Sequence, residues 1–185
     1  AKELIDLARA RPGKLNFGSA GLGSGTHFAG EMFKYSAGID VVHVPYRGIA
    51  EATKDLLGGR IQAMTASIPA TLPLIAERRV RVLAVTGAKR AAQLPDVPSW
   101  QEEGVSDADV TNYWGIVAPI GTSAEVVARV NGAVKTVLGD ADVRERLERE
   151  GAEVVSGTPE QLGFIIAHDL ARWKKLVADI GMALQ

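Results

Sequence analysis

Glycines, hydroxyls and a histidine gather in one short segment, FGSAGLGSGTHFAGEMF, at residues 17–33. Five glycines, two serines, a threonine and a histidine surround the start of a stretch whose apolar residues follow helical spacing. Backbone N–H groups at a helix start attract anions, because the helix dipole is positive there. The segment therefore predicts a site for a phosphate, a nucleophile or a carboxylate. The structural alternative is that the glycines only let a strand and a helix pack closely.

Three well-known motifs do not fit this segment. A phosphate-binding P-loop needs a lysine after its last glycine, but Gly23 is followed by Ser24 and Gly25. The dinucleotide-binding fingerprint needs a glycine where this sequence has Thr26, so only a degenerate resemblance is left. A serine nucleophile on a sharp turn needs glycines two residues before and after it, and neither Ser19 nor Ser24 has both. What remains is a neutral cradle of N–H groups and hydroxyls for a small anion such as a carboxylate.

Cysteine and histidine content limits the other chemistry. The chain has no cysteine, which excludes thiolate catalysis, zinc–thiolate sites and disulfides. It has three histidines, His27, His43 and His168, and their spacings do not place two of them on one helix face. We therefore expect no metal site. His43 lies in a valine-rich stretch and is interpreted as a buried histidine with satisfied hydrogen bonds.

Composition indicates an ordinary globular protein. Hydrophobic residues make up 46% of the 185 residues, and 21 basic residues are balanced by 22 acidic ones. No large field of one sign is present to attract nucleic acid, so we expect no nucleic-acid partner. No apolar run approaches the ~20 residues that a membrane span requires. Residues 1–14 have charges spread through them, unlike a secretory leader.

Predicted strands and helices alternate through the first half of the chain. Apolar β-branched runs that end at glycine or proline indicate strands, and 3.6-residue periodicity indicates helices. The expected order is strand 15–20, helix 26–38, strand 39–45, helix 49–57 with Gly58 and Gly59 past its end, strand 60–67, helix 70–79 and strand 80–89. Such alternation implies crossover connections and a largely parallel sheet with helices on its faces.

The second half is predicted to be mostly helical. We expect a short helix after Pro98 and one more strand at residues 111–119. Three helices follow, over 123–140, 141–151 and 159–181. Thr122 or Ser123 is the expected N-cap of the first, and Thr158-Pro159 starts the last.

Several separated blocks resemble one known family, the periplasmic solute-binding proteins of tripartite tricarboxylate transporters, or Bug-type proteins. The blocks are KLNFGSAGLGSGTHFAGEMFK, HVPYRGIAEATKDLLGGRIQAM, VRVLAVTGAKRAAQLPDVPSWQEEG and YWGIVAPIGT, followed by VRERLEREGAE. The resemblance runs from end to end of the chain. It implies a two-lobed α/β fold of the type II periplasmic-binding-protein kind, which closes on a carboxylated solute.

The resemblance also implies a domain arrangement. Residues 14–112 are expected to form the α/β ligand-binding lobe. Residues 1–13 and 113–185 are expected to supply the crossover and the mostly helical remainder of the other lobe. Because the resemblance begins in the family's middle, we expect a fragment or a truncated homologue that lacks part of one lobe and its ligand loop.

Site residues carry over from the family by position. The turn of Ser19, Ala20 and Gly21 resembles the second-lobe loop that meets the ligand carboxylate. The residues expected beside it are Gly23, Ser24, Thr26 and His27.

Two further strand ends complete the expected site. Tyr46, Arg47 and Gly48 follow one strand, and Arg47 is expected to offer a bidentate fork to a second carboxylate; the alternative is a solvated arginine at a helix start. Ser67 follows the next strand. Relatives often have an Asp-Asn pair there, so Ala66 and Ser67 depart from the family's pattern.

The sequence thus predicts a periplasmic binding protein, not an enzyme. Its expected partners are a small carboxylate (a di- or tricarboxylate, an amino acid or an aromatic acid) and the membrane subunits of a transporter, with no cofactor and no metal. The alternative is a small enzyme that uses the glycine-rich segment to bind an anionic or nucleotide substrate. That enzyme needs an acid–base pair near Gly18–Thr26, which the sequence does not show.

Overall fold

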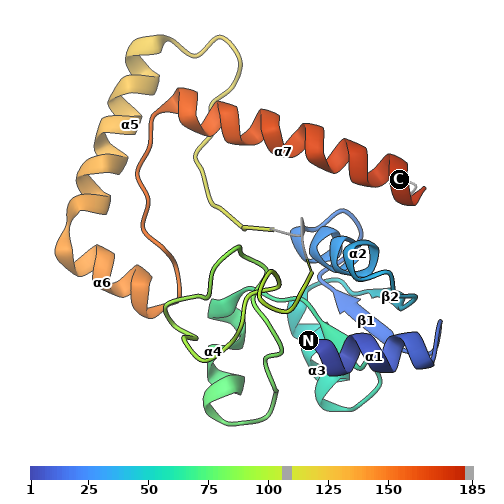
Figure 1. The fold of residues 1–185 in the computed structure, drawn as a ribbon. Helices are drawn as coiled ribbons and strands as arrows, with labels where there is room; N and C mark the ends of the chain where they lie inside the picture. Colours follow the sequence, from blue (N-terminus) through green and yellow to red (C-terminus); the bar gives the residue numbers. More distant parts are fainter. Residues whose placement is uncertain (106–109, 182–185) are drawn as a thin grey trace. The chain divides into compact units, whose positions relative to one another are not determined.

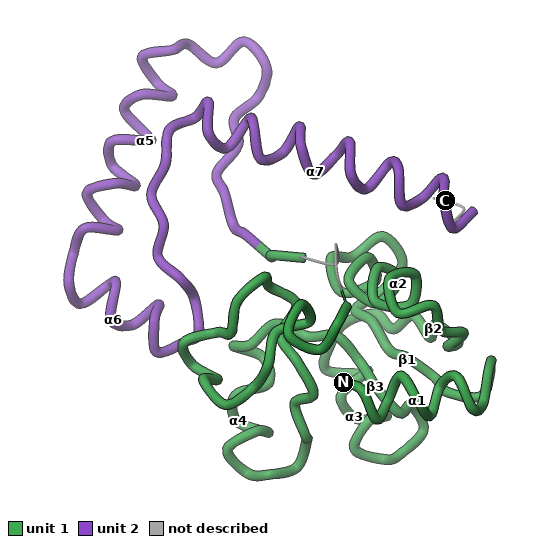
Figure 2. The backbone as a smooth tube through the Cα atoms, viewed as in Figure 1, with its two compact units in different colours: residues 1–112, 184 green, residues 113–183, 185 purple. Residues whose placement is uncertain are grey.

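A computed structural model describes residues 1–105 and 110–181 (Figure 1). The chain divides into two compact units, residues 1–112 and residues 113–183 (Figure 2). Within the described ranges, the first unit has four helices and a three-stranded sheet, and the second has three helices. The α/β class expected from the sequence is confirmed.

Unit 1 (residues 1–112) follows the predicted alternation. Its elements are α1 (Lys2–Ala10), β1 (Asn16–Ser19), α2 (Gly25–Ala37), β2 (Val42–Pro45), α3 (Ile49–Leu57), β3 (Ala63–Met64) and α4 (Ile68–Ala76). The strands are parallel, in the order β2-β1-β3. Helix α2 connects β1 to β2, and α3 connects β2 to β3, so all three strands end at the same edge of the sheet.

The core of unit 1 forms where α2 lies against β1. Phe17 of β1 is 6% exposed, and a Cβ atom built on Gly30 of α2 would lie 1.8 Å from its ring. Only glycine therefore lets the helix approach the strand this closely. This contact supports the packing interpretation of the segment for Gly30, and it fixes the helix that carries the candidate site.

Unit 2 (residues 113–183) contains α5 (Ala124–Gly139), α6 (Ala141–Arg149) and α7 (Pro159–Ile180). Ser123 caps α5 by accepting a hydrogen bond from the backbone N–H of Val126. Thr158 and Gln161 form a capping box at the start of α7. The predicted helices of this half are confirmed. None of the helices in the described ranges is long and apolar enough to cross a bilayer.

Several predicted elements are wrong. Residues 80–89 form no strand, and only Val85 makes an isolated parallel bridge, to Ser99. Residues 111–119 also form no strand, and turns replace the helix expected after Pro98. A strand exists only where a neighbour accepts its hydrogen bonds, and an apolar run cannot show whether that neighbour is present.

The N-terminal helix α1 was not predicted, and it packs within unit 1. Ile5 and Ala8 are buried, and the Arg9 guanidinium donates to the carbonyl of Ala37 (2.8 Å). The backbone N–H of Lys2 donates to a carboxylate oxygen of Glu103 (2.9 Å). The expected assignment of residues 1–13 to the other lobe of a two-lobed protein stays a prediction.

Candidate functional site

The carboxyl ends of the three strands bring their loops together. Backbone pairing places Ser19 opposite Pro45, and the N–H of Tyr46 donates to the carbonyl of Ser19 (3.2 Å). Beyond β3, the Thr65 hydroxyl donates to the carbonyl of Thr26 (2.5 Å). The loops after β1, β2 and β3 therefore meet at one edge, which is where open α/β sheets place their ligand sites.

The glycine-rich loop, residues 20–26, has a shape that depends on two of its glycines. Gly21 has a φ of 127° and Gly23 a φ of 73°, conformations that L side chains rarely adopt. A Cβ atom on Gly21 would also lie 3.0 Å from the carbonyl oxygen of Tyr46. These glycines make the turn possible and bring it close to the loop that follows β2.

Hydroxyl groups close the glycine-rich loop on itself. The Thr26 hydroxyl accepts from the N–H of Ala20 (2.9 Å). The Ser24 hydroxyl donates to the carbonyl of Gly21 (2.7 Å) and accepts from the N–H of His27 (3.1 Å), which makes Ser24 the N-cap of α2. The hydroxyls of Ser24 and Thr26 thus shape the loop, and their expected contact with a ligand stays a prediction.

Most backbone N–H groups of this segment already have an acceptor. Acceptors within the segment take the N–H groups of Ala20, Gly21, Gly23, Ser24 and His27. These five donors of the expected N–H cradle are therefore not available to a ligand in this conformation.

Three N–H groups of the loop have no acceptor among the described residues: those of Leu22, Gly25 and Thr26. Gly25 and Thr26 are the first two residues of α2, where the helix dipole favours an anion. Leu22 was not predicted as a site residue, because its apolar side chain, 63% exposed, gives no sign of a free backbone donor.

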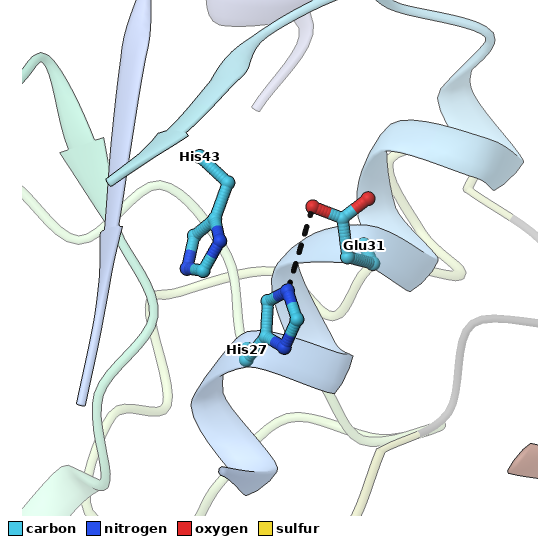
Figure 3. Close-up of side chains that lie close together, drawn as sticks. All are labelled: His27, Glu31 and His43. Atoms are coloured by element: carbon cyan, nitrogen blue, oxygen red, sulfur yellow. Dashed lines mark ion pairs between the residues drawn. The ribbon is translucent and has the colours of Figure 1, made fainter. Parts of the chain in front are cut away.

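The side chains of two histidines and a glutamate lie close together (Figure 3). His27 and Glu31 project from α2, and His43 projects from β2. The imidazole rings of His27 and His43 stack, with centroids 4.1 Å apart and planes 18° apart. Glu31 Oε1 lies 3.9 Å from His27 Nε2, and Lys34 donates to Glu31 from 2.9 Å.

Both histidines bind the loop through ring nitrogens. His27 Nδ1 accepts a hydrogen bond from the N–H of Gly23 (3.1 Å), and His43 Nε2 lies 2.7 Å from the hydroxyl oxygen of Ser19. Burial lowers the pKa of His27. Burial, followed by the charge of His27, lowers the pKa of His43 to about 4. Both rings are therefore neutral near pH 7. The interpretation of His43 as a buried histidine holds only in part: the ring is half-buried, and its Nε2 contacts the Ser19 hydroxyl.

The Ser19–His43 contact has the length of a nucleophile–base pair, but its surroundings do not suit catalysis. Ser19 is 0% exposed, so no substrate carbonyl reaches its hydroxyl. That hydroxyl instead accepts from the N–H of Gly21 (3.1 Å). The Ser19 hydroxyl thus stabilises the turn at Ala20 and Gly21. The ligand-binding role expected for its side chain stays a prediction that this burial does not favour.

His27, Glu31 and His43 lie close enough together to be considered as ligands of a metal ion. One ligand atom from each of His27, Glu31 and His43 lies within 4.8 Å of the others. Histidine spacing missed this cluster because a neighbouring strand supplies His43. Yet His27 Nδ1 accepts from Gly23, so the proton of the neutral ring is on Nε2, which then has no lone pair for a metal.

The loop after β2 carries one free cationic group. The Tyr46 hydroxyl donates to Asp55 (2.9 Å), and burial, together with Asp55, raises its pKa. Arg47 is exposed, its N–H donates to Glu51 (3.2 Å), and its guanidinium has no partner within the described part of the chain. Gly48 is the N-cap of α3.

The loop after β3 carries Ser67, whose expected contact with the ligand stays a prediction. Ser67 is the N-cap of α4 and is partly exposed, and its carbonyl accepts from Thr71 (3.2 Å). An unpredicted polar group lies near the free donors instead: Asn112 Oδ1 would be 3.0 Å from a Cβ atom on Gly25. Sequence distance from the glycine-rich loop concealed this neighbour.

Comparison with known proteins decides the family. Residues 1–182 match the family described as "Tripartite tricarboxylate transporter family receptor", TctC. The chain belongs to this family. TctC proteins are solute-binding receptors of transporters and not enzymes. The Bug-type resemblance stated from the sequence is confirmed.

Individual relatives agree with that assignment. The chain is 38% identical over 178 residues to the "UPF0065 protein in tcbD-tcbE intergenic region" of Pseudomonas sp. (strain P51), which covers 96% of this chain and 53% of that protein. The chain thus spans about half the length of this curated relative.

Two solved structures are similar to the chain. "R. palustris Rpa4515 with adipate" has a TM-score of 0.90 at 35% identity, over 99% of this chain and 61% of that one. "MatC (Rpa3494) from Rhodopseudomonas palustris with bound malate" has a TM-score of 0.83 at 29% identity, over 95% of this chain and 61% of that one.

Proposed function

We propose that this chain is the receptor part of a tripartite tricarboxylate transporter that captures a small carboxylated solute at the start of α2. The observation that carries the proposal is the set of free N–H groups on Leu22, Gly25 and Thr26 in a chain of the TctC family. A carboxylate has two oxygens that accept such donors, and the positive end of the α2 dipole favours its charge. Adipate and malate in the two compared structures support a carboxylate as the solute.

Arg47 is the proposed anchor for a second carboxylate. It is exposed, it follows β2 at the edge where the glycine-rich loop lies, and its guanidinium has no partner in the described ranges. A guanidinium binds a carboxylate through two parallel hydrogen bonds. We therefore propose a dicarboxylate in preference to a monocarboxylate.

The proposed setting follows from the family. We propose that the protein acts in the periplasm and passes its solute to the membrane subunits of the transporter. The mechanism is lobe closure, in which one lobe holds the carboxylate and a second lobe covers it. We propose that residues 14–112 supply the surface that holds the carboxylate.

Replacing Gly25 with proline tests whether the backbone N–H of Gly25 binds the solute. Proline is favoured at the first position of a helix and removes the N–H that we propose binds the solute. The preceding residue, Ser24, has φ −73° and ψ 158°, the conformation that proline requires of its neighbour. Gly25→Ala is the matched control, because it adds a side chain but keeps the N–H.

Isothermal titration calorimetry with adipate and malate gives the readout. We expect Gly25→Pro to weaken binding about tenfold or more, since hydrogen bonds to charged groups are the stronger kind, whereas Gly25→Ala stays within about twofold of the parent. Equal affinity in the parent and Gly25→Pro contradicts the site. Arg47→Ala should weaken adipate binding about tenfold but leave hexanoate unchanged; an equal loss for both acids contradicts the second anchor.

Chain length is the second variable in that experiment. Because about half of the curated relative's length lies outside this chain, the 185-residue chain is expected to bind weakly. A chain extended to the relatives' full length should bind one acid tightly. Citrate, succinate, glutamate, nicotinate and terephthalate complete the panel. If the extended chain binds none of these acids, the carboxylate receptor proposal is wrong.

A further inference from the structure

The His27–His43 pair contacts the turn that carries the glycine-rich loop at two points. Of the loop's N–H groups, that of Gly23 has a histidine nitrogen as its acceptor, His27 Nδ1 at 3.1 Å. Ser19, which starts the turn and holds the Gly21 N–H, has its hydroxyl oxygen 2.7 Å from His43 Nε2. Two ring nitrogens thus hold both ends of the turn that carries the free donors.

We propose that His27 and His43 are positioning residues: their neutral rings hold the glycine-rich loop in the shape that presents the N–H groups of Leu22, Gly25 and Thr26 to the solute. The pair contacts the turn and not the free donors themselves, so it acts through the backbone. This inference rests on the proposed carboxylate site. It adds that the two histidine rings determine the conformation of the glycine-rich loop.

The hydrogen bond from Gly23 fixes the protonation state of His27. An acceptor nitrogen carries no proton, so the neutral ring of His27 has its proton on Nε2, on the side of Glu31. Protonation of the ring places a second N–H opposite the N–H of Gly23 and removes the only acceptor described for it. The positioning therefore depends on a neutral ring.

The surroundings of the pair work against protonation. His27 is 4% exposed, and its ring stacks on His43 at 4.1 Å, so two imidazolium charges would repel at short range. The charged groups that act on both rings are Glu31, which favours protonation, and Lys34, which opposes it. Lys34 binds Glu31 and offsets part of its charge. Acidification therefore favours loop conformations in which the histidines are released to water.

Two variants separate the hydrogen bond from the bulk of the ring. His27→Asn places an amide oxygen near the position of Nδ1, so it keeps an acceptor for Gly23 but does not titrate. His27→Ala removes the acceptor. Nuclear magnetic resonance of the 185-residue chain reports both the tautomer of His27 and the exchange protection of the Gly23 N–H, after division by the intrinsic exchange rate at each pH.

The expected results are specific. At pH 7.5, His27 carries its proton on Nε2. Protection of the Gly23 N–H in the parent falls about tenfold as the pH drops well below 6.5. In His27→Ala it is about tenfold lower than in the parent at pH 7.5 and does not change with pH, and in His27→Asn it stays near the parent's pH 7.5 value throughout. A proton on Nδ1, or Gly23 protection equal in the parent and His27→Ala, overturns the proposal.

Adipate titration distinguishes this failure from that of the proposed function. If the loop responds as expected but the extended chain binds no acid, the positioning role stands and the receptor proposal fails. If adipate binds with equal affinity to the parent and His27→Ala, the receptor proposal stands and the positioning role is overturned. Weaker binding in His27→Ala that is restored in His27→Asn supports both.

Discussion

Units 1 and 2 both contain well-formed helices, but they differ in what those helices enclose. Unit 1 buries Phe17, Met32 and Ile61 between its sheet and helices. In the described part of unit 2, Leu176 is the one buried hydrophobic side chain, whereas Trp114 and Phe164 are each 72% exposed. A helix end is a local feature, but a core needs surfaces from distant parts of the chain.

The N-cap residues are similar in the two units, although the packing of the helices differs. Ser123, Asp140 and Thr158 cap the helices of unit 2 as well as Ser24 caps α2 in unit 1. In unit 1 the capped helix lies on β1 and presents its first N–H groups to a candidate site. In unit 2 the described residues form no strand for the helices to cover. An N-cap side chain therefore does not distinguish a helix at a candidate site from a helix that has no described strand to pack on in its own unit.

The largest expected effect comes from two matched phenylalanine changes. Phe17→Ala should cost about 3–5 kcal/mol, because it leaves a cavity beneath α2. Phe164→Ala should cost less than about 0.5 kcal/mol, since its side chain is already exposed. Urea unfolding, followed by circular dichroism and by the fluorescence of buried Trp100, measures both. Equal costs would show that unit 2 also encloses its phenylalanine in solution.

Matched changes at two N-caps should have smaller effects. Ser24→Ala and Thr158→Ala each remove a side-chain cap, for a loss of about 1 kcal/mol in the free energy of unfolding. Only Ser24→Ala should also weaken adipate binding, because the Ser24 hydroxyl holds the carbonyl of Gly21. Thermal unfolding and calorimetry provide the two readouts. If Thr158→Ala weakens binding as much, the site is not confined to unit 1.

Acid should destabilise unit 1 through His43. The unfolded histidine titrates near pH 6.5 and the folded one near pH 4, so the unfolded state binds more protons between these values. Stability is therefore fully present above pH 6.5 and falls as the pH approaches 4. Allowing for screening by water, we expect a loss of about 1 kcal/mol. His43→Gln should flatten this part of the profile and His168→Gln should not; the reverse result contradicts the assignment.

The smallest effect is expected on α6. Arg146 Nε and Glu150 Oε1 form an i,i+4 ion pair at 3.5 Å, and both side chains are more than half exposed. Glu150→Gln should change the free energy of unfolding by only about 0.3 kcal/mol, and less at 0.5 M salt. Chemical unfolding at low and high salt measures this. A change above 1 kcal/mol would mean that the charged face of α6 is packed against another surface.

Much of unit 1 could be predicted from local patterns. The run of glycines before Thr26, the valines around His43 and the glycines after Leu57 correctly indicated β1-α2-β2-α3, because strand ends and helix caps depend on nearby residues. The strand expected at residues 80–89 was wrong because its pairing depends on a neighbour that local sequence does not specify.

For the candidate site, too, some features could be predicted from local sequence and others could not. By itself, the sequence determined the family and the α/β class, because both follow from the order and type of neighbouring residues. It also predicted a site in the loop after β1, and that location stays a proposal. Only the tertiary structure decided which backbone donors are free, and it brought His43 from β2 onto His27. Hydrogen bonds are made between groups that folding brings together, so their partners depend on the folded chain and not on spacing along it.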